Sequence, residues 1–170
     1  MNLTIPENIA ELTHINIRTE KHGEEDVTAC DLSISVVLPN EVLDQLFISE
    51  AAPYKSAFWD AEGRVSEPTI SGIKLSHNFK GHTFKISVGI EDAKASDDVA
   101  IKGLSWTPEN GRTLKLKFKV GIRCDEEDIA HFATGLNKHV QIAVIPPAQM
   151  DIEDAKPAEE KPTKRRKAAA

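Results

Sequence analysis

The chain has 170 residues, of which 40% are apolar and 28% charged, and its formal net charge is −6. This length suits one domain with an appendage and allows a genuine core. An acidic chain is not expected to bind duplex DNA tightly, because the neutralisation of phosphates by basic side chains dominates that affinity. The sequence contains no run of the roughly 18 apolar residues that a membrane span needs, and its start lacks a signal-peptide pattern. We therefore expect a cytoplasmic protein that does not enter a membrane.

The first elements are two strands. Residues 9–18 and 27–38 both alternate apolar and polar side chains and are joined by a polar turn, which predicts a β-hairpin. Cys30 shares the apolar positions of the second strand, and Cys124 shares those of a later one. This pattern predicts two buried free thiols rather than a disulfide or a metal pair.

A short helix and an irregular segment follow. Asn40 is placed to cap a helix over residues 41–47, which is too short to be stable alone. Residues 48–70 show no regular period and contain a group of aromatic residues, Tyr54, Phe58 and Trp59. Long aromatic loops are often functional, but we favour the interpretation that this one folds back over the core.

The middle of the chain predicts another hairpin. Apolar residues alternate over 73–79 and again over 82–90, with Lys80-Gly81 as a two-residue turn between them. Residues 99–106 form a further strand, whose apolar positions change parity at Gly103. A β-bulge at this glycine explains the change.

The clearest strand of the sequence is 112–124. Its alternate apolar residues, Leu114 to Ile122, predict a face that is buried in the core. Asp125 then caps a helix whose buried stripe is expected at Ile129, Phe132, Ala133 and Leu136. A last strand spans 140–145 and ends before two prolines.

These elements predict an α+β fold, mainly antiparallel β. About seven strands in hairpins and two short helices packed on the sheet or sheets follow the order ββαββββαβ. A sandwich and an open sheet both fit this pattern. We expect one domain over residues 1–147 and a disordered charged tail over 148–170, since the tail has too few apolar residues to offset the entropy of ordering.

Catalytic chemistry is not indicated. The sequence has no nucleophile elbow, P-loop or dinucleotide-binding glycine pattern, and its six histidines have no recognised metal spacing. We therefore predict a protein that is not an enzyme and that needs neither cofactor nor metal.

The polar face of strand 112–124 is the first candidate for binding. Its lysines recur about every 7 Å, close to the spacing of phosphates in an extended single strand. If both strong hairpins share one sheet, the lysines form one surface: Lys74, Lys80, Lys85, Lys115, Lys117 and Lys119. Trp106 or the aromatic loop is then expected beside it as a stacking surface. The plainer alternative is that these lysines only solubilise the strands.

The tail adds a basic cluster, Lys164, Arg165, Arg166 and Lys167, which suits electrostatic contact with nucleic acid or simple solubility. Without the last 21 residues the chain holds 22 acidic and 15 basic residues, so the basic candidates belong to an acidic domain.

The segment Val27-Thr-Ala-Cys-Asp-Leu-Ser-Ile-Ser-Val-Val-Leu-Pro-Asn-Glu-Val-Leu-Asp44 resembles small, poorly characterised accessory proteins of tailed bacteriophages and prophages. The resemblance implies work in the cytoplasm of a bacterial host, near recombination or replication, and implies no residue roles. Our first hypothesis is a non-catalytic accessory protein that binds single-stranded nucleic acid. The alternative is a protein-binding inhibitor of a host defence or DNA-processing enzyme.

Overall fold

In the computed structural model, the described residues are 2–23, 25–47, 51–70, 72–89 and 93–147. These residues form seven strands, three short α-helices and one 3-10 turn. The strands are β1 (Ile5–His22), β2 (Glu25–Pro39), β3 (Ile73–Lys74), β4 (Phe79–Ser87), β5 (Lys94–Glu109), β6 (Thr113–Arg123) and β7 (His139–Ile145). The helical elements are η1 (Asn40–Val42), α1 (Leu43–Leu46), α2 (Ala52–Phe58) and α3 (Glu126–Gly135).

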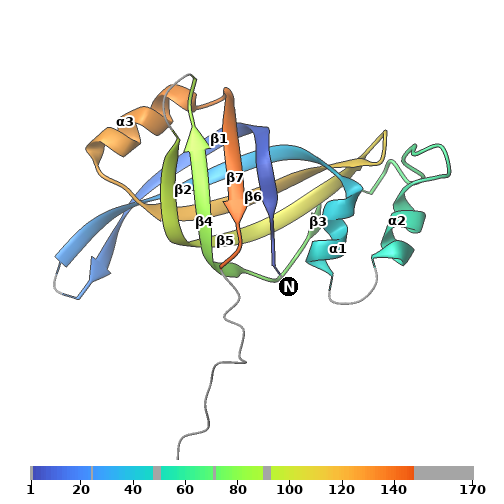
Figure 1. Ribbon diagram of the computed structural model, residues 1–170, viewed down its shortest axis with the longest axis horizontal. Helices are drawn as coiled ribbons and strands as arrows, with labels where there is room; N and C mark the ends of the chain where they lie inside the picture. Colours follow the sequence, from blue (N-terminus) through green and yellow to red (C-terminus); the bar gives the residue numbers. More distant parts are fainter. Residues whose placement is uncertain (1, 24, 48–50, 71, 90–92, 148–170) are drawn as a thin grey trace, which may run out of the picture.

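The strands form one antiparallel sheet that closes on itself. Its order is β3-β5-β4-β7-β1-β2-β6, and β6 pairs in addition with β5, so six strands complete a ring. The short β3 pairs only with β5, at Ile73–Trp106 and Lys74–Ser105. The β1–β2 hairpin extends beyond its neighbours, at the left in Figure 1. The prediction of a mainly antiparallel α+β fold is confirmed, and the sheet is neither a sandwich nor open.

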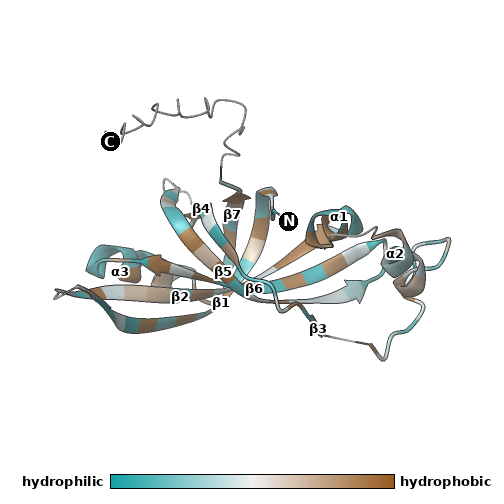
Figure 2. Cartoon of the chain, turned by 90° about the horizontal axis from the view of Figure 1, so that it is seen from below, coloured by the Kyte–Doolittle hydropathy of each residue, from teal (hydrophilic) through white to brown (hydrophobic). Residues whose placement is uncertain are grey.

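The core lies inside the closed sheet. Every second residue of β6 from Leu114 to Ile122 is buried, and the residues between them face outward. Figure 2 shows the corresponding alternation of hydrophobic and hydrophilic residues along the strands. Because closure gives each of the six strands of the ring a neighbour on both sides, their backbone polar groups are paired while the inner face stays apolar.

Helices cover the two ends of the ring. In Figure 1, α3 lies at one end and α1 and α2 lie at the other. Asp125 caps α3, as predicted, with its carboxylate accepting from Asp128 N at 2.8 Å. Asp128 also pairs with Lys94 of β5 at 3.1 Å, which fixes the start of α3 to the sheet. None of the described helices is long and apolar enough to cross a membrane.

Three local predictions at the helices are wrong. Asn40 does not cap the first helix, because the chain turns one residue earlier and Asn40 itself begins η1. Residues 48–70 contain a helix, α2, which has Pro53 in its first turn. In α3 the buried residues are His131, Phe132 and Gly135, whereas Ala133 and Leu136 are exposed.

The predicted hairpin with a turn at Lys80-Gly81 is also wrong. β4 runs through both residues, and its partners are β5 and β7 rather than β3. Gly81 has a φ of +73° and lies at a shift of register, so it forms a bulge inside a strand. A lysine and a glycine suit either a bulge or a tight turn, and the choice depended on partners that are distant in sequence.

The two cysteines form a disulfide, which corrects the prediction of free thiols. Cys30 of β2 and Cys124, just after β6, have Cα atoms 6.4 Å apart, within the usual range for a disulfide. Their apolar parity indicated burial correctly, but only the β2–β6 pairing brings them together. Disulfides are rare in reducing compartments, so a cytoplasmic location stays a proposal.

Reduction of this disulfide is expected to lower the free energy of unfolding by about 2–5 kcal/mol, since the bond closes a long loop in the unfolded chain. Urea unfolding with and without a phosphine reductant measures the difference. Two titratable thiols in the denatured, unreduced protein would contradict the disulfide.

The bulge predicted at Gly103 is confirmed. Gly103 has a φ of +65°, and the β5–β6 register shifts between Lys102 and Ser105. Ile101 and Leu104 consequently both face the core, although three positions separate them.

Gly103→Ala is expected to cost about 1–2 kcal/mol of unfolding free energy, because an L-residue is strained at this φ. Steric overlap does not contribute, since a Cβ at this position would meet nothing within 4 Å. Ser105→Ala, two positions away, is the control and should be nearly neutral. Equal stabilities for the two variants would contradict the conformational argument.

Candidate nucleic-acid interface

The lysines of β6 lie on the outer face of the closed sheet. Lys117 and Lys119 are exposed and Lys115 is half-buried, while Leu116 and Phe118 between them point into the core. Along the strand these lysines are about 7 Å apart. The alternation that buries the core of β6 therefore also places its charges on one surface.

Strand pairing adds two further lysines to this surface. Lys102 of β5 lies directly opposite Lys119, and Ser105 lies opposite Lys117. On the other side of Ser105, β3 contributes Lys74. We call these five residues the lysine face: Lys74, Lys102, Lys115, Lys117 and Lys119.

Serines flank two lysines of the lysine face. Ser35 and Ser105 flank Lys117 on the two neighbouring strands, and Ser33 flanks Lys119. These side chains are small and carry hydroxyl donors. Ser35 is buried, so an anion on the lysine face meets the hydroxyl groups of Ser33 and Ser105, which are partly exposed.

Lys80 and Lys85 are placed differently from the prediction. Lys80 follows Phe79 on β4 and precedes the bulge, and Phe79 pairs with Ile101 of β5. Lys80 therefore lies diagonally across from Lys102, at the margin of the lysine face. Lys85 lies between Ala95 and Ala143. It is about 17 Å further along β4 than Lys80, so the structure separates it from the lysine face.

Two carboxylates neutralise part of this charge. Lys115 Nζ lies 3.6 Å from Glu109 Oε1, and Lys102 Nζ lies 3.4 Å from Asp31 Oδ1. Asp31 also accepts a hydrogen bond from Arg18 Nε at 3.1 Å. Among the described residues, Lys74, Lys117 and Lys119 have no ion-pair partner.

Asp31 is held in its charged form. Partial burial by itself raises the pKa of its carboxyl, but the hydrogen bond from Arg18 and the charge of Lys102 outweigh that effect. The pKa is therefore below its ordinary value of 3.8. Arg18 also forms an ion pair with Glu20, so it joins two strand positions on the outer face.

The aromatic loop does not provide a stacking surface beside the lysines. Trp59 is buried, donates from Nε1 to Glu109 O at 2.7 Å and stacks on the buried Trp106. Phe58 packs edge-on against Trp106, with ring centroids 5.1 Å apart. Tyr54 is 42% exposed, but one side of its ring stacks on Phe47. These residues cap the core, as the favoured interpretation predicted.

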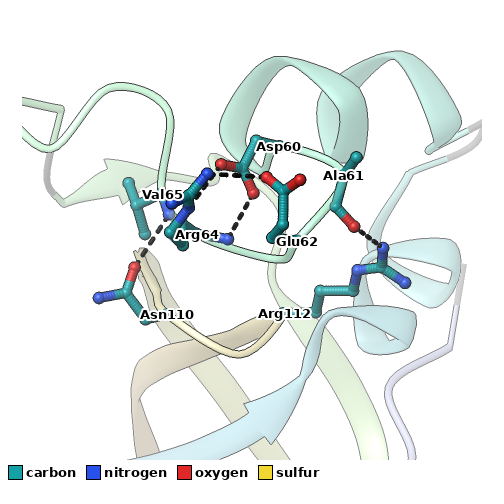
Figure 3. Close-up of polar contacts among 7 residues, drawn as sticks. All are labelled: Asp60, Ala61, Glu62, Arg64, Val65, Asn110 and Arg112. Carbon is teal, nitrogen blue, oxygen red and sulfur yellow. Dashed lines mark hydrogen bonds and ion pairs between the residues drawn. The ribbon is translucent and has the colours of Figure 1, made fainter.

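The loop is fixed to the β5–β6 turn by polar contacts, which Figure 3 shows. Arg112 donates to Ala61 O at 2.7 Å, and Asn110 Oδ1 accepts from Val65 N at 3.0 Å. Gly63 O accepts from Gly111 N at 2.8 Å. These bonds hold the segment after Trp59 against the sheet and so keep the tryptophan inside.

The basic cluster 164–167 lies outside the described residues, as does the whole predicted tail. Within the described part of the chain, no group of three or more His, Cys, Asp or Glu side chains is arranged to hold a metal ion.

Sequence reasoning missed Lys102. The alternating pattern of this strand does indicate that Lys102 faces outward, because Lys102 follows the buried Ile101. Parity, however, shows the direction of a side chain and not the neighbouring strand, so the opposition of Lys102 and Lys119 appears only in the closed sheet.

Comparison with known proteins adds no relative: the chain matches no protein-family model, no curated protein and no solved structure. The resemblance to phage accessory proteins therefore stays a prediction. The fold and the outer face define the protein only as a closed antiparallel sheet with a basic surface.

The charge on Asp31 gives a pH-dependent prediction. Its pKa in the folded state is below the unfolded value, so the carboxylate stabilises the fold above pH 4, and this contribution is lost as pH falls through the folded pKa. Asp31→Asn should therefore weaken the decline of unfolding free energy below pH 4, measured by urea titration at several pH values. Asp26→Asn, at an exposed position of the hairpin, is the control, and the same acid dependence in both variants would contradict the role of Asp31.

Proposed function

We propose that this protein binds single-stranded nucleic acid through the lysine face, as a non-catalytic accessory protein in DNA metabolism. The proposal rests on geometry and charge. Five lysines from three strands share one outer surface, and Ser105 lies between Lys74 and Lys117.

The observation that carries the proposal is the pairing of Lys102 with Lys119. Like charges directly opposite each other on neighbouring strands are destabilising, with Cα atoms about 5 Å apart. Asp31 offsets the charge of Lys102, but Lys119 has no ion-pair partner among the described residues. A bound phosphate between the two ammonium groups removes this repulsion, which favours an anionic partner.

The mode of binding follows from what the surface lacks. Trp59 and Trp106 are buried, so the lysine face offers phosphates charge and hydrogen bonds but offers bases no stacking partner. The spacing of about 7 Å along β6 suits an extended strand. Binding along this face should therefore depend strongly on salt and weakly on sequence.

The acidic remainder of the chain limits this binding to one side. The net charge of the whole chain is −6, so the lysine face is a local exception on a surface that repels polyanions. Such an arrangement orients a nucleic acid rather than attracting it to the whole surface. An accessory role beside phage recombination or replication enzymes, in the cytoplasm of a bacterial host, is consistent with a moderate affinity of this kind.

A second candidate function is inhibition of a host defence or DNA-processing enzyme by direct contact. Ile9 is 67% exposed and Val37 45% exposed on the outer face of neighbouring strands. The pairing of Ala10 with Val36 places these two side chains opposite each other. An exposed aliphatic pair of this kind favours a protein partner.

The salt dependence of oligonucleotide binding tests the first proposal. Lys117→Ala combined with Lys119→Ala should make the slope of log K against log salt concentration shallower by about 1.4, because each phosphate contact on a single strand contributes about 0.7. Fluorescence anisotropy with a labelled oligothymidine measures this slope.

The matched control combines Lys85→Ala with Lys138→Ala, which removes the same charge at positions outside the lysine face. An equal loss of slope in both double variants would show that only total charge matters. If no oligonucleotide binds at moderate salt, the result favours the second candidate function, inhibition of an enzyme.

A further inference from the structure

The chain leaves the described part of the structure close to the lysine face. Pro147 is the last described residue and follows β7, which pairs with β4. It lies against Gly81 of β4, since a Cβ at Gly81 would be 3.7 Å from Pro147 Cβ. Gly81 comes directly after Lys80, at the margin of the lysine face. The residues beyond Pro147 therefore start beside the basic surface.

The path from Pro147 to the centre of the lysine face is short. Ile101 of β5 pairs with Phe79 of β4 and with Val120 of β6, so these three strands lie side by side. Neighbouring strands are about 4.8 Å apart, so the three steps from β7 across β4 and β5 to β6 amount to roughly 15 Å. An extended chain covers this distance in about five residues.

The sequence places acidic residues at this distance. Asp151, Glu153 and Asp154 come four to seven residues after Pro147, and we call residues 151–154 the acidic segment. Residues 151–160 hold five acidic residues and one lysine, whereas the basic cluster follows only at 164–167. The part of the chain that first comes within reach of the lysine face is therefore acidic.

The charges of the described residues favour the lysine face over the surface around Pro147. A Cβ at Gly81 would also lie 4.0 Å from Asp98 Oδ1, so a carboxylate is close to the start of the segment and repels acidic side chains there. Lys117 and Lys119, by contrast, have no ion-pair partner among the described residues.

We propose that the acidic segment binds the lysine face of its own chain and is displaced when a nucleic acid binds there. This inference rests on the proposed function, because it concerns the regulation of the same surface. In an extended chain Asp151 and Glu153 point the same way about 7 Å apart, which matches the spacing of Lys117 and Lys119 along β6.

The attachment of the segment to the domain determines how strongly it competes. A short connection keeps the carboxylates at a high effective concentration near the lysines. Exposed ion pairs are individually weak, so the segment lowers the affinity for a nucleic acid without preventing its binding. The contact also weakens as salt is added, because both partners are exposed charges.

Neutralising the segment in the full chain tests the competition. The tail variant combines Asp151→Asn, Glu153→Gln and Asp154→Asn. It should bind labelled oligothymidine about threefold more tightly than the wild type in fluorescence anisotropy at low salt, because a tethered competitor has been removed. The gain should disappear when Lys117→Ala and Lys119→Ala are also present.

The matched control removes three carboxylates from exposed positions outside the lysine face, by Glu7→Gln, Asp26→Asn and Glu126→Gln. It should change the affinity less than the tail variant does. Equal gains in the two variants would show that only total charge matters and would overturn the inference.

A second measurement needs no nucleic acid. A nitroxide label on Ala155→Cys should broaden the amide NMR signals of Lys117 and Lys119, and the broadening should be lost at about 1 M salt, where the Debye length is about 3 Å. The two native cysteines are buried and joined, so the label is selective. Lys85 is the internal control, because it pairs with Ala143 and so is also roughly 14 Å from Pro147.

The outcomes separate this inference from the proposed function. Equal broadening at Lys85 and at Lys119, or oligonucleotide binding that the tail variant does not tighten, overturns the inference and leaves the proposed function standing. Selective broadening at Lys117 and Lys119 in a protein that binds no oligonucleotide supports the contact with the acidic segment and overturns the proposed function.

Discussion

The pairing of β6 with strands on both of its sides is the constraint on which the structure depends. β6 pairs with β2 along its whole length and with β5 from Thr113 to Gly121. Without the β5–β6 ladder the sheet is open, and the row from Leu114 to Ile122 loses its enclosure. Closure gives every inner residue apolar neighbours from opposite strands, and it leaves no long sheet edge between β5 and β6.

The same pairing arranges the outer surface. Because β6 is enclosed on both sides, Lys117 and Lys119 lie between serines of β2 and residues of β5, and the backbone of Lys119 is fixed opposite Lys102. Two features of β5 then decide how far this surface reaches. The bulge at Gly103 restores the inward direction of Leu104 and Trp106, and the ladder between β5 and β6 ends at Ala100 and Gly121. The lysine face lies along the paired part of the two strands.

Charge on this surface is balanced unevenly. Asp31 forms ion pairs with both Arg18 and Lys102, and Glu109 forms one with Lys115, so the charge at the two ends of the lysine face is partly compensated within the protein. Lys117 and Lys119 lie between these pairs, and no acidic side chain of the described residues contacts them. An anionic ligand therefore gains most at the centre of the face, where the described residues supply no competing carboxylate.

The sequence by itself determined the direction of side chains, and the tertiary structure decided their neighbours. Local sequence patterns correctly indicated the inner face of β6, the burial of Cys30 and Cys124, the bulge at Gly103 and the cap at Asp125, because all of these follow from local backbone geometry. They did not indicate the disulfide, the partners of β4, or the opposition of Lys102 and Lys119. Strands are joined by backbone groups that are the same in every residue, so an alternating pattern fits many partners. Only closure of the sheet selects among them.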